Sequence, residues 1–233
     1  MRSLVIYVII TCFAVWIGYH RYKISQFTRS RSKGSYNISS SQKNITDEYQ
    51  FYNRSEQNRN GYFEFKHIVY KHGLCGNLQT PPLKRPCTPY LHVHPYQNEQ
   101  FILLQGQLSY HLGAAIHSCD IHTCPSPIII PPLVPHTFWM NDNQEDLILI
   151  IRIEPAYRTY GLRAESFENI VGAHRDNILN IWQAFVFIEN IDTYPVFLPL
   201  FFSKLFIKTG SLIGHLLGYQ VEYDEYTTRN FEI

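Results

Sequence analysis

The sequence lacks an excess of charge of either sign. Its 20 Lys and Arg residues nearly balance its 19 Asp and Glu residues, which leaves a formal net charge of +1 at pH 7. No basic stripe with interleaved aromatic residues is present, so the chain carries no electrostatic footprint for nucleic acid. It also lacks an internal repeat of solenoid length, which excludes a repeat architecture. We therefore expect a partner other than nucleic acid.

Charged residues are scarce as well. They make up 17% of the chain, against 45% hydrophobic and 15% aromatic residues. This composition is typical of a globular protein and not of a disordered one. At 233 residues the chain can hold one good-sized domain with appendages. The aromatic share favours a β-rich core.

Residues 1–23 have the composition of a targeting segment. Leu4 to Tyr19 carries no charge, and basic residues lie on both sides of it. A membrane-spanning helix usually needs about 20 apolar residues, whereas a cleaved signal peptide has a shorter apolar core. We favour an uncleaved signal anchor with one transmembrane segment. A cleaved leader, which would make the protein secreted, stays open.

Residues 24–60 are rich in Ser, Asn and Gln and show no sustained period, which predicts a flexible linker. The basic residues between 21 and 33 would stay in the cytoplasm under the positive-inside rule. Three glycosylation sequons point the other way, at Asn37, Asn44 and Asn53. We expect a glycoprotein whose folded part is lumenal or extracellular.

Cysteines support that compartment. Apart from Cys12 in the apolar segment, the chain has two close pairs, Cys75 with Cys87 and Cys119 with Cys124. An even number in close pairs fits two disulfides in an oxidising compartment. Four buried thiols or a zinc site is the alternative.

The most informative stretch runs from His92 to Gly106. Tyr, Leu and Val favour a strand up to His94, which places His92 and His94 on one face. A second strand begins at Glu99, after a break at Pro95. Two imidazoles and a carboxylate suit a divalent transition metal such as Fe, Mn, Zn, Ni or Cu. Hydrogen-bonded core histidines are the alternative.

A second segment, residues 128–141, adds His136 after a proline-stiffened turn. Together the two segments resemble the paired motifs of the cupin superfamily. The first motif, His-x-His, four residues, Glu, six residues, Gly, matches completely. In the second, Pro131 and His136 match, Leu133 stands where glycine is usual, and Asn141 lies one residue late.

The resemblance implies a mainly β fold, the single-domain, RmlC-like jelly-roll barrel of type-2 cupins. At least seven short strands separated by turn residues agree with it. We expect the barrel over residues 61–157 and a helical extension over 158–233, packed outside the barrel or lying in a bilayer interface. The metal ligands implied by the resemblance are His92, His94, Glu99 and His136.

Side-chain alternation supplies candidates for a pocket beside the metal. Tyr90, Phe101 and Phe138 share a face with the predicted ligands. Arg152 joins them if its face of the 146–154 strand points inward, where it would anchor a substrate carboxylate. Otherwise it pairs with Glu154 or with a loop carboxylate, which we favour. The predicted pocket is small, aromatic-lined and mostly apolar.

Two functions fit these predictions. The first is a membrane-anchored, metal-dependent enzyme, most simply an oxidoreductase of dioxygenase type acting on a small organic substrate. The second is a non-catalytic module that binds a small ligand or acts as a scaffold. The absence of an obvious general acid or base beyond the ligands favours the second modestly. The resemblance also implies a homodimer.

Overall fold

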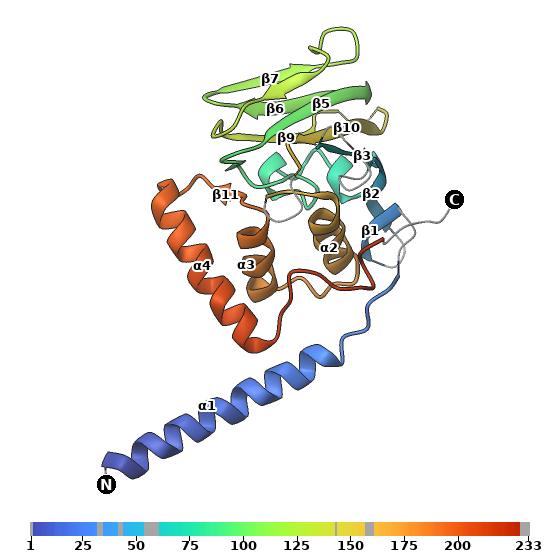
Figure 1. The fold of residues 1–233 in the computed structure, drawn as a ribbon. Coiled ribbons are helices and arrows are strands. Elements are labelled where there is room, and N and C mark those ends of the chain that lie inside the picture. The colour runs from blue at the N-terminus through green and yellow to red at the C-terminus, as the bar shows by residue number, and fades with distance from the viewer. Residues whose placement is uncertain are drawn as a thin grey trace.

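The computed structural model describes residues 2–31, 35–41, 44–53, 61–142, 144–156 and 161–228. Helix α1 (Arg2–Ser25) projects from one side of the domain, and two antiparallel sheets form the opposite side (Figure 1). Helices α2 (Ala164–Arg175), α3 (Ile181–Asn190) and α4 (Leu200–Leu217) lie between them. The mainly β fold with helices outside the sheets is therefore confirmed.

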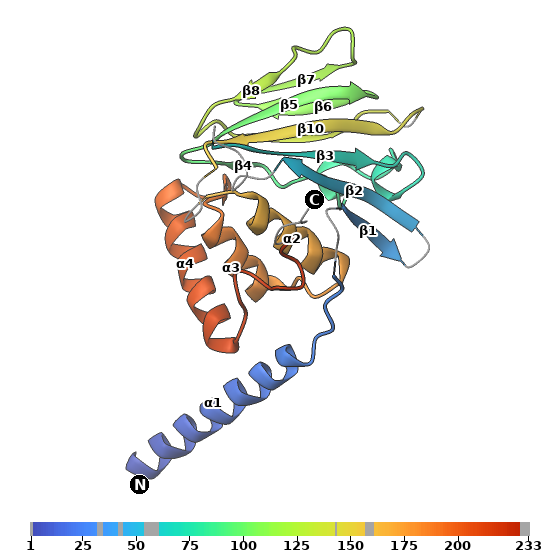
Figure 2. The ribbon, with the colours of Figure 1, turned by 45° about the vertical axis from the view of Figure 1, so that its right-hand side comes forward.

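The two sheets face each other (Figure 2). The six-stranded sheet has the order β1 (Ser35–Ser41), β2 (Asn44–Asn53), β3 (Phe63–Val69), β10 (Leu147–Glu154), β5 (Asn98–Gln105) and β8 (Ile128–Ile130). The five-stranded sheet has the order β11 (Tyr194–Pro195), β4 (His92–Val93), β9 (His136–Met140), β6 (Leu108–Leu112) and β7 (Ala115–Cys119). Among the described residues, no strand pairing joins the two sheets into a continuous barrel.

Alternation sets the inner face of each strand. Strand β10 pairs with β3 on one side and β5 on the other, and its residues Leu147, Leu149, Ile151 and Ile153 are buried. The residues between them are only half-buried, so this strand is fully covered on one face, although its residues are apolar on both. One hydrophobic core joins the two sheets and helix α2, where Phe167 stacks on Phe65 at 4.5 Å between ring centroids.

The interpretation of residues 24–60 as a flexible linker needs correction. Residues 35–41 and 44–53 form β1 and β2, and β2 pairs with β3. Before them, Ile24 and Phe27 pack with the helical layer, and the Ser30 backbone amide donates to Asp176 Oδ2 at 2.6 Å. The Asn, Ser and Gln residues of this segment have low strand propensity, so composition does not predict these strands. They form because they pair with the rest of the sheet.

Residues 32–34, 42–43 and 54–60 lie outside the described part. Glycosylation of Asn37, Asn44 and Asn53 and the placing of the other domain boundaries stay predictions.

The strand predicted over residues 88–94 is also shorter than expected. Only His92 and Val93 form β4, because Pro89 and Pro95 lack the backbone N–H that a ladder needs. Two short 3₁₀ helices, η2 (Leu74–Gly76) and η3 (Pro82–Lys84), precede it.

Both predicted disulfides are confirmed. Cys75 is bonded to Cys87, and Cys119 is bonded to Cys124. Two segments, Val5–Ser25 and α4, are long and apolar enough to cross a membrane. Together these features are compatible with a membrane-anchored or secreted protein.

Gly106 provides a test of the β5–β6 turn. Its φ is +87°, and an added Cβ would lie 2.8 Å from the Asp146 carbonyl oxygen. Gly106→Ala should therefore lower the free energy of unfolding by about 1–3 kcal/mol, measured by denaturant titration.

Gly113→Ala is the matched control, because Gly113 also has a positive φ, +64°, but no neighbour within 4 Å of the added Cβ. Equal losses in the two variants would mean that only backbone conformation matters at Gly106.

Candidate metal centre

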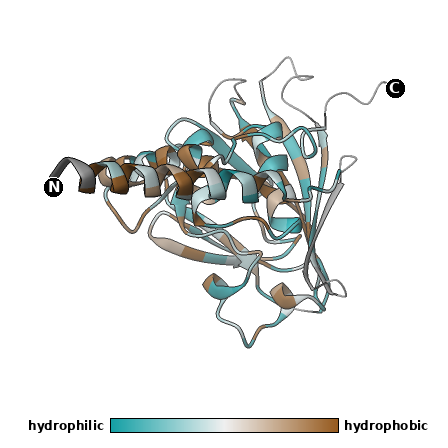
Figure 3. Ribbon diagram, turned by 90° about the horizontal axis from the view of Figure 1, so that it is seen from below, coloured by the Kyte–Doolittle hydropathy of each residue, from teal (hydrophilic) through white to brown (hydrophobic). Residues whose placement is uncertain are grey.

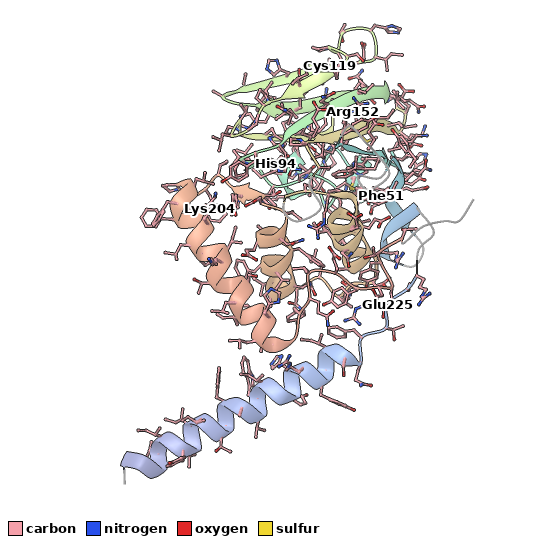
Figure 4. All side chains as sticks on the ribbon, in the orientation of Figure 1. Phe51, His94, Cys119, Arg152, Lys204 and Glu225 are labelled. Atoms are coloured by element: carbon pink, nitrogen blue, oxygen red, sulfur yellow. A yellow bond between two sulfur atoms is a disulfide. The ribbon has the colours of Figure 1, made fainter. Side chains whose placement is uncertain are left out.

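Four buried side chains converge between the two sheets. His92 of β4 and His136 of β9 are directly paired in one sheet, His94 follows β4, and Glu99 lies on β5 of the facing sheet. His92 Nε2 lies 3.2 Å from His94 Nε2, and His136 Nε2 lies 2.7 Å from Glu99 Oε2. His94 Nε2 is 3.6 Å from the same carboxylate oxygen. Figure 4 shows His94 where the sheets meet the helical layer.

The other nitrogen of each imidazole is held from outside the cluster. His92 Nδ1 lies 2.7 Å from the Tyr90 carbonyl oxygen, and His136 Nδ1 lies 2.9 Å from that of Val134. His94 Nδ1 lies 3.1 Å from Thr193 Oγ1. The two carbonyls accept from N–H, so these rings must carry a proton at Nδ1, and the Thr193 hydroxyl can accept in the same way. This is how metal-binding histidines are usually oriented.

The turn before His136 lacks the glycine that is usual in the cupin motif that this segment resembles. Leu133 takes its place with a φ of +64°, and its amide donates to the His94 carbonyl oxygen at 2.8 Å. That hydrogen bond ties the two motif segments together. The departure from the motif therefore changes the residue but keeps the left-handed turn.

The donor set fits a transition-metal ion. The four ligand atoms lie within 4.8 Å of one another. For metal–ligand bonds of about 2.0–2.2 Å, neighbouring ligands lie roughly 3 Å apart and opposite ligands roughly 4 Å apart. Three imidazoles and one carboxylate suit Fe, Mn, Zn, Ni or Cu and leave coordination positions open on a six-coordinate ion. The metal's identity is not determined by this geometry.

Proton sharing within the cluster also agrees with a metal-binding role. Burial alone would lower the pKa of His136, but its hydrogen bond to Glu99 and the charge of that carboxylate outweigh burial and raise it. Burial would raise the pKa of Glu99, but hydrogen bonds from His136 and His94 lower it well below its usual range. Burial and the neighbouring imidazoles lower the pKa of His92. The cluster thus pairs an anionic carboxylate with a proton that a cation would replace.

The cluster forms part of the wall of a cavity of about 200 Å³. Most of the remaining wall is aromatic or aliphatic. Besides His92, His94 and Glu99, the lining residues are Tyr49, Phe65, His67, Pro89, Tyr90, Phe138, Ile151, Leu162, Phe167, Ile170, Ile191 and Thr193.

Another histidine in the wall, besides His92 and His94, does not belong to the metal cluster. His67 of β3 is buried, stacks on Tyr49 at 4.2 Å, and has Nε2 3.0 Å from Asp47 Oδ2. Its Nδ1 has no hydrogen-bond partner among the described residues. Because Nε2–H donates to the Asp47 carboxylate, Nδ1 carries the lone pair. Burial, the charge of Asp47 and a hydrogen bond to it raise the pKa of Tyr49.

The predicted pocket residues are placed in three ways. Tyr90 and Phe138 line the cavity, and Tyr90 lies edge-on to His92 at 5.4 Å. Phe101 points inward but belongs to the core, where it packs edge-on against Phe138. Arg152 lies on the outer face of the sheet, so its assignment to the pocket is wrong.

Arg152 Nη2 lies 2.6 Å from Glu64 Oε1 of the neighbouring strand, and its guanidinium lies over the Tyr62 ring. Within the described residues its ion-pair partner is Glu64; Glu154 instead accepts a hydrogen bond from Gln100, and no loop carboxylate pairs with Arg152 there. The inner face of β10 carries the odd-numbered residues instead.

Much of the wall could not be found from the motifs. Tyr49 comes from strand β2 in the Asn- and Ser-rich segment, as does Asp47, which holds the lining residue His67. Phe167, Ile170 and Thr193 come from the helical extension. The only sequence signal for His67 was its inward position in the alternation of β3.

Two facing antiparallel sheets, with the His-x-His, Glu and His side chains meeting between them, are a cupin-type double-stranded β-helix fold, as the resemblance implies. No family model matches the sequence. Among solved structures, an RmlC-like cupin from Shewanella frigidimarina is 15% identical, with a TM-score of 0.33 over 57% of this chain and 88% of that chain.

Two proteins named as oxidoreductases are similar in sequence. "Probable oxidoreductase virH" of Hypocrea virens is 28% identical over 149 residues, 59% of this chain and 67% of that protein. An oxidoreductase of Arthrobotrys oligospora is 29% identical over 153 residues, 60% of each chain. The matched part thus spans about two thirds of the first relative's length and less of the second's.

Metal content tests the ligand set. The purified full chain should carry close to one equivalent of a transition metal by elemental analysis, and His94→Ala should lose most of it because one of four donors is gone. His122→Ala, which changes an exposed histidine outside the cluster, should keep the metal. Unchanged loading in His94→Ala would remove His94 from the ligand set.

Proposed function

We propose that the protein is a metal-dependent oxidoreductase that acts on a small, largely apolar substrate carrying a hydroxyl group. The observation that carries the proposal is the convergence of four buried metal-type donors, three of which line an aromatic-lined cavity. The two similar proteins are named as oxidoreductases, which agrees with this reaction class. The simplest oxidant is dioxygen, bound together with the substrate.

The size of the cavity limits the substrate. An apolar cavity of about 150 Å³ in another protein holds one benzene ring, and the cavity here is about 200 Å³. Phe65, Phe138 and Phe167 would contact the faces or edges of a ring. A single-ring compound with short substituents therefore fits best.

His92, His94, Glu99 and His136 would hold the metal ion. When bound, such an ion supplies Lewis-acid and, for Fe, Mn or Cu, redox chemistry. The protein supplies the position of the substrate and a dry surrounding, because the walls are apolar and the four side chains are buried. Exclusion of water strengthens every electrostatic interaction at the centre.

His67 gives the site a proton acceptor that is not a ligand. Asp47 holds His67 Nε2 and so fixes its tautomer, as a carboxylate does in other histidine–carboxylate pairs. Its Nδ1 lone pair would accept a hydrogen bond, and then the proton, from the substrate hydroxyl. A buried acceptor without a partner costs about 1–3 kcal/mol, which a bound hydroxyl would recover.

A non-catalytic binding module is the second candidate. The absence of a general base no longer favours it, because the Asp47–His67 pair lies at the cavity. Anchoring by α1, a lumenal or extracellular position, glycosylation and a homodimer remain parts of the proposal. A gain in electrophoretic mobility on deglycosylation, absent when Asn37, Asn44 and Asn53 become Gln, would support the lumenal position.

Oxygen uptake separates the two candidates. The metal-loaded full chain should consume oxygen with at least one member of a panel of single-ring phenols. Binding of the same compounds, measured by quenching of tryptophan fluorescence, without oxygen uptake would contradict the proposed enzymatic function and favour the binding module.

The role of His67 has its own test. His67→Phe should lower kcat roughly 100-fold or more while the metal content stays unchanged, because general base catalysis is lost and the ligands remain. Asp47→Asn should lower kcat less and change its pH profile. Full activity in His67→Phe would exclude proton transfer by this residue.

A further inference from the structure

Helix α4 is apolar on two opposite faces. Its inner face packs on the domain through Ile207 and Leu217, and its small residues Gly210 and Gly214 lie against Phe185 and Val186 of α3. Its outer face is also apolar, although its side chains are 48–72% exposed: Phe201, Phe202, Leu205, Phe206, Leu212 and Leu216. A helix that is apolar around most of its circumference belongs in a protein interior or in a membrane.

Helix α1 meets α4 at the end of the domain. The Arg21 side chain lies 3.1 Å from the position of a Cβ added at Gly218, just after α4, and Ile24 packs with Leu217. The preceding residues of α1, from Val5 to Val15, are exposed and mostly apolar (Figure 3). The exposed apolar surface therefore continues from one helix to the other.

Both helices lie on the same side of the molecule. In Figures 1 and 2, α3 and α4 lie between α1 and the sheets, and β7 lies at the opposite end. A bilayer that receives the apolar part of α1 must therefore lie on the side where the outer face of α4 is bare. Arg21, Lys23 and Lys208 are exposed beside this surface, where their charges can meet lipid phosphates. Lys204 lies on α4 as well (Figure 4).

An apolar groove runs from this side to Tyr90 in the wall of the metal cavity. It has a volume of about 540 Å³, and its walls include Ile181, Phe185 and Ile188 of α3 and Phe206 of α4. Tyr90 lines both this groove and the metal cavity, and its side chain is 44% exposed. The groove therefore ends at the residue that separates it from His92.

We propose that the outer face of α4 docks on a phospholipid surface beside the inserted α1. The depth of burial is that of an interfacial helix, with the aromatic and leucine side chains at the level of the acyl chains and the lysines at the headgroups. Docking opens the groove toward the lipid, which gives an apolar substrate a path to Tyr90. That last step rests on the proposed function, whereas docking does not.

Spin labels on the full chain test docking directly. In a Cys12→Ser background, Leu205→Cys and Leu212→Cys carry the label on the outer face of α4, and Ile9→Cys carries it on α1. Ile116→Cys is the matched control, because Ile116 is 66% exposed on β7, at the far end of the domain. The protein is reconstituted in vesicles of phosphatidylcholine with a minor share of phosphatidylglycerol.

Collision rates with oxygen and with a water-soluble nickel chelate are then measured. At positions 205 and 212 the oxygen-to-nickel ratio should be several-fold higher than at position 116 and should approach that at position 9. Ratios equal to that at position 116 would overturn the proposal. Shielding from both reagents would also overturn it, because a protein partner or a second copy would then cover α4.

Metal content confirms that each labelled chain is folded, and it keeps the two proposals apart. A water-exposed α4 with intact metal and turnover would reject docking alone. Labels at lipid depth without turnover would reject the proposed function alone.

Discussion

The centre depends on hydrogen bonds that orient three imidazole rings before any ion arrives. The carbonyl oxygens of Tyr90 and Val134 and the hydroxyl of Thr193 hold the Nδ1 atoms, so the Nε2 atoms face one another and Glu99. This arrangement needs only a short stretch of regular backbone. Strand β4 has only two residues, yet it pairs with both β9 and β11 and so fixes His92 against His136. A metal ion that binds here would replace the proton shared between His136 and Glu99, and the ligand side chains are already oriented toward it.

The helical extension completes the cavity that the sheets begin. Phe167 and Ile170 of α2 form part of its wall, and Thr193, between α3 and β11, lies 3.1 Å from His94 Nδ1. Gln97 ties the extension to the sheets, because its amide group bonds to Pro155 and Leu162. The residues that shape the substrate site and those that bind the metal therefore come from different parts of the chain. Changes in the extension can alter substrate choice while the metal ligands stay in place.

The sequence predicts the part of the structure that local pattern controls. The resemblance to the cupin motifs implies the four ligands, and the structure brings them together, because a motif on short strands fixes which side chains face inward. Strand β3 follows from the alternation of its residues, and β10 follows from its continuous run of Leu and Ile. Alternation left the direction of Arg152 open, because parity alone does not tell which face of a strand is inner. In the structure Arg152 forms an ion pair, as we favoured, but its partner is Glu64 of the neighbouring strand. Strands β1 and β2 and the hydrogen-bonded side chains of Asp47 and His67 were not predicted. They form through pairing of β2 with β3, which the local residue pattern does not reveal.

The central claim is that three imidazoles and one carboxylate bind one metal ion inside the sheets. X-ray absorption spectroscopy of the metal-loaded full chain tests it most directly. The account predicts a first shell of nitrogen and oxygen at about 2.0–2.2 Å with the outer-shell scattering of three imidazoles. A shell with sulfur, or one made only of water-like oxygen without imidazole scattering, would contradict it.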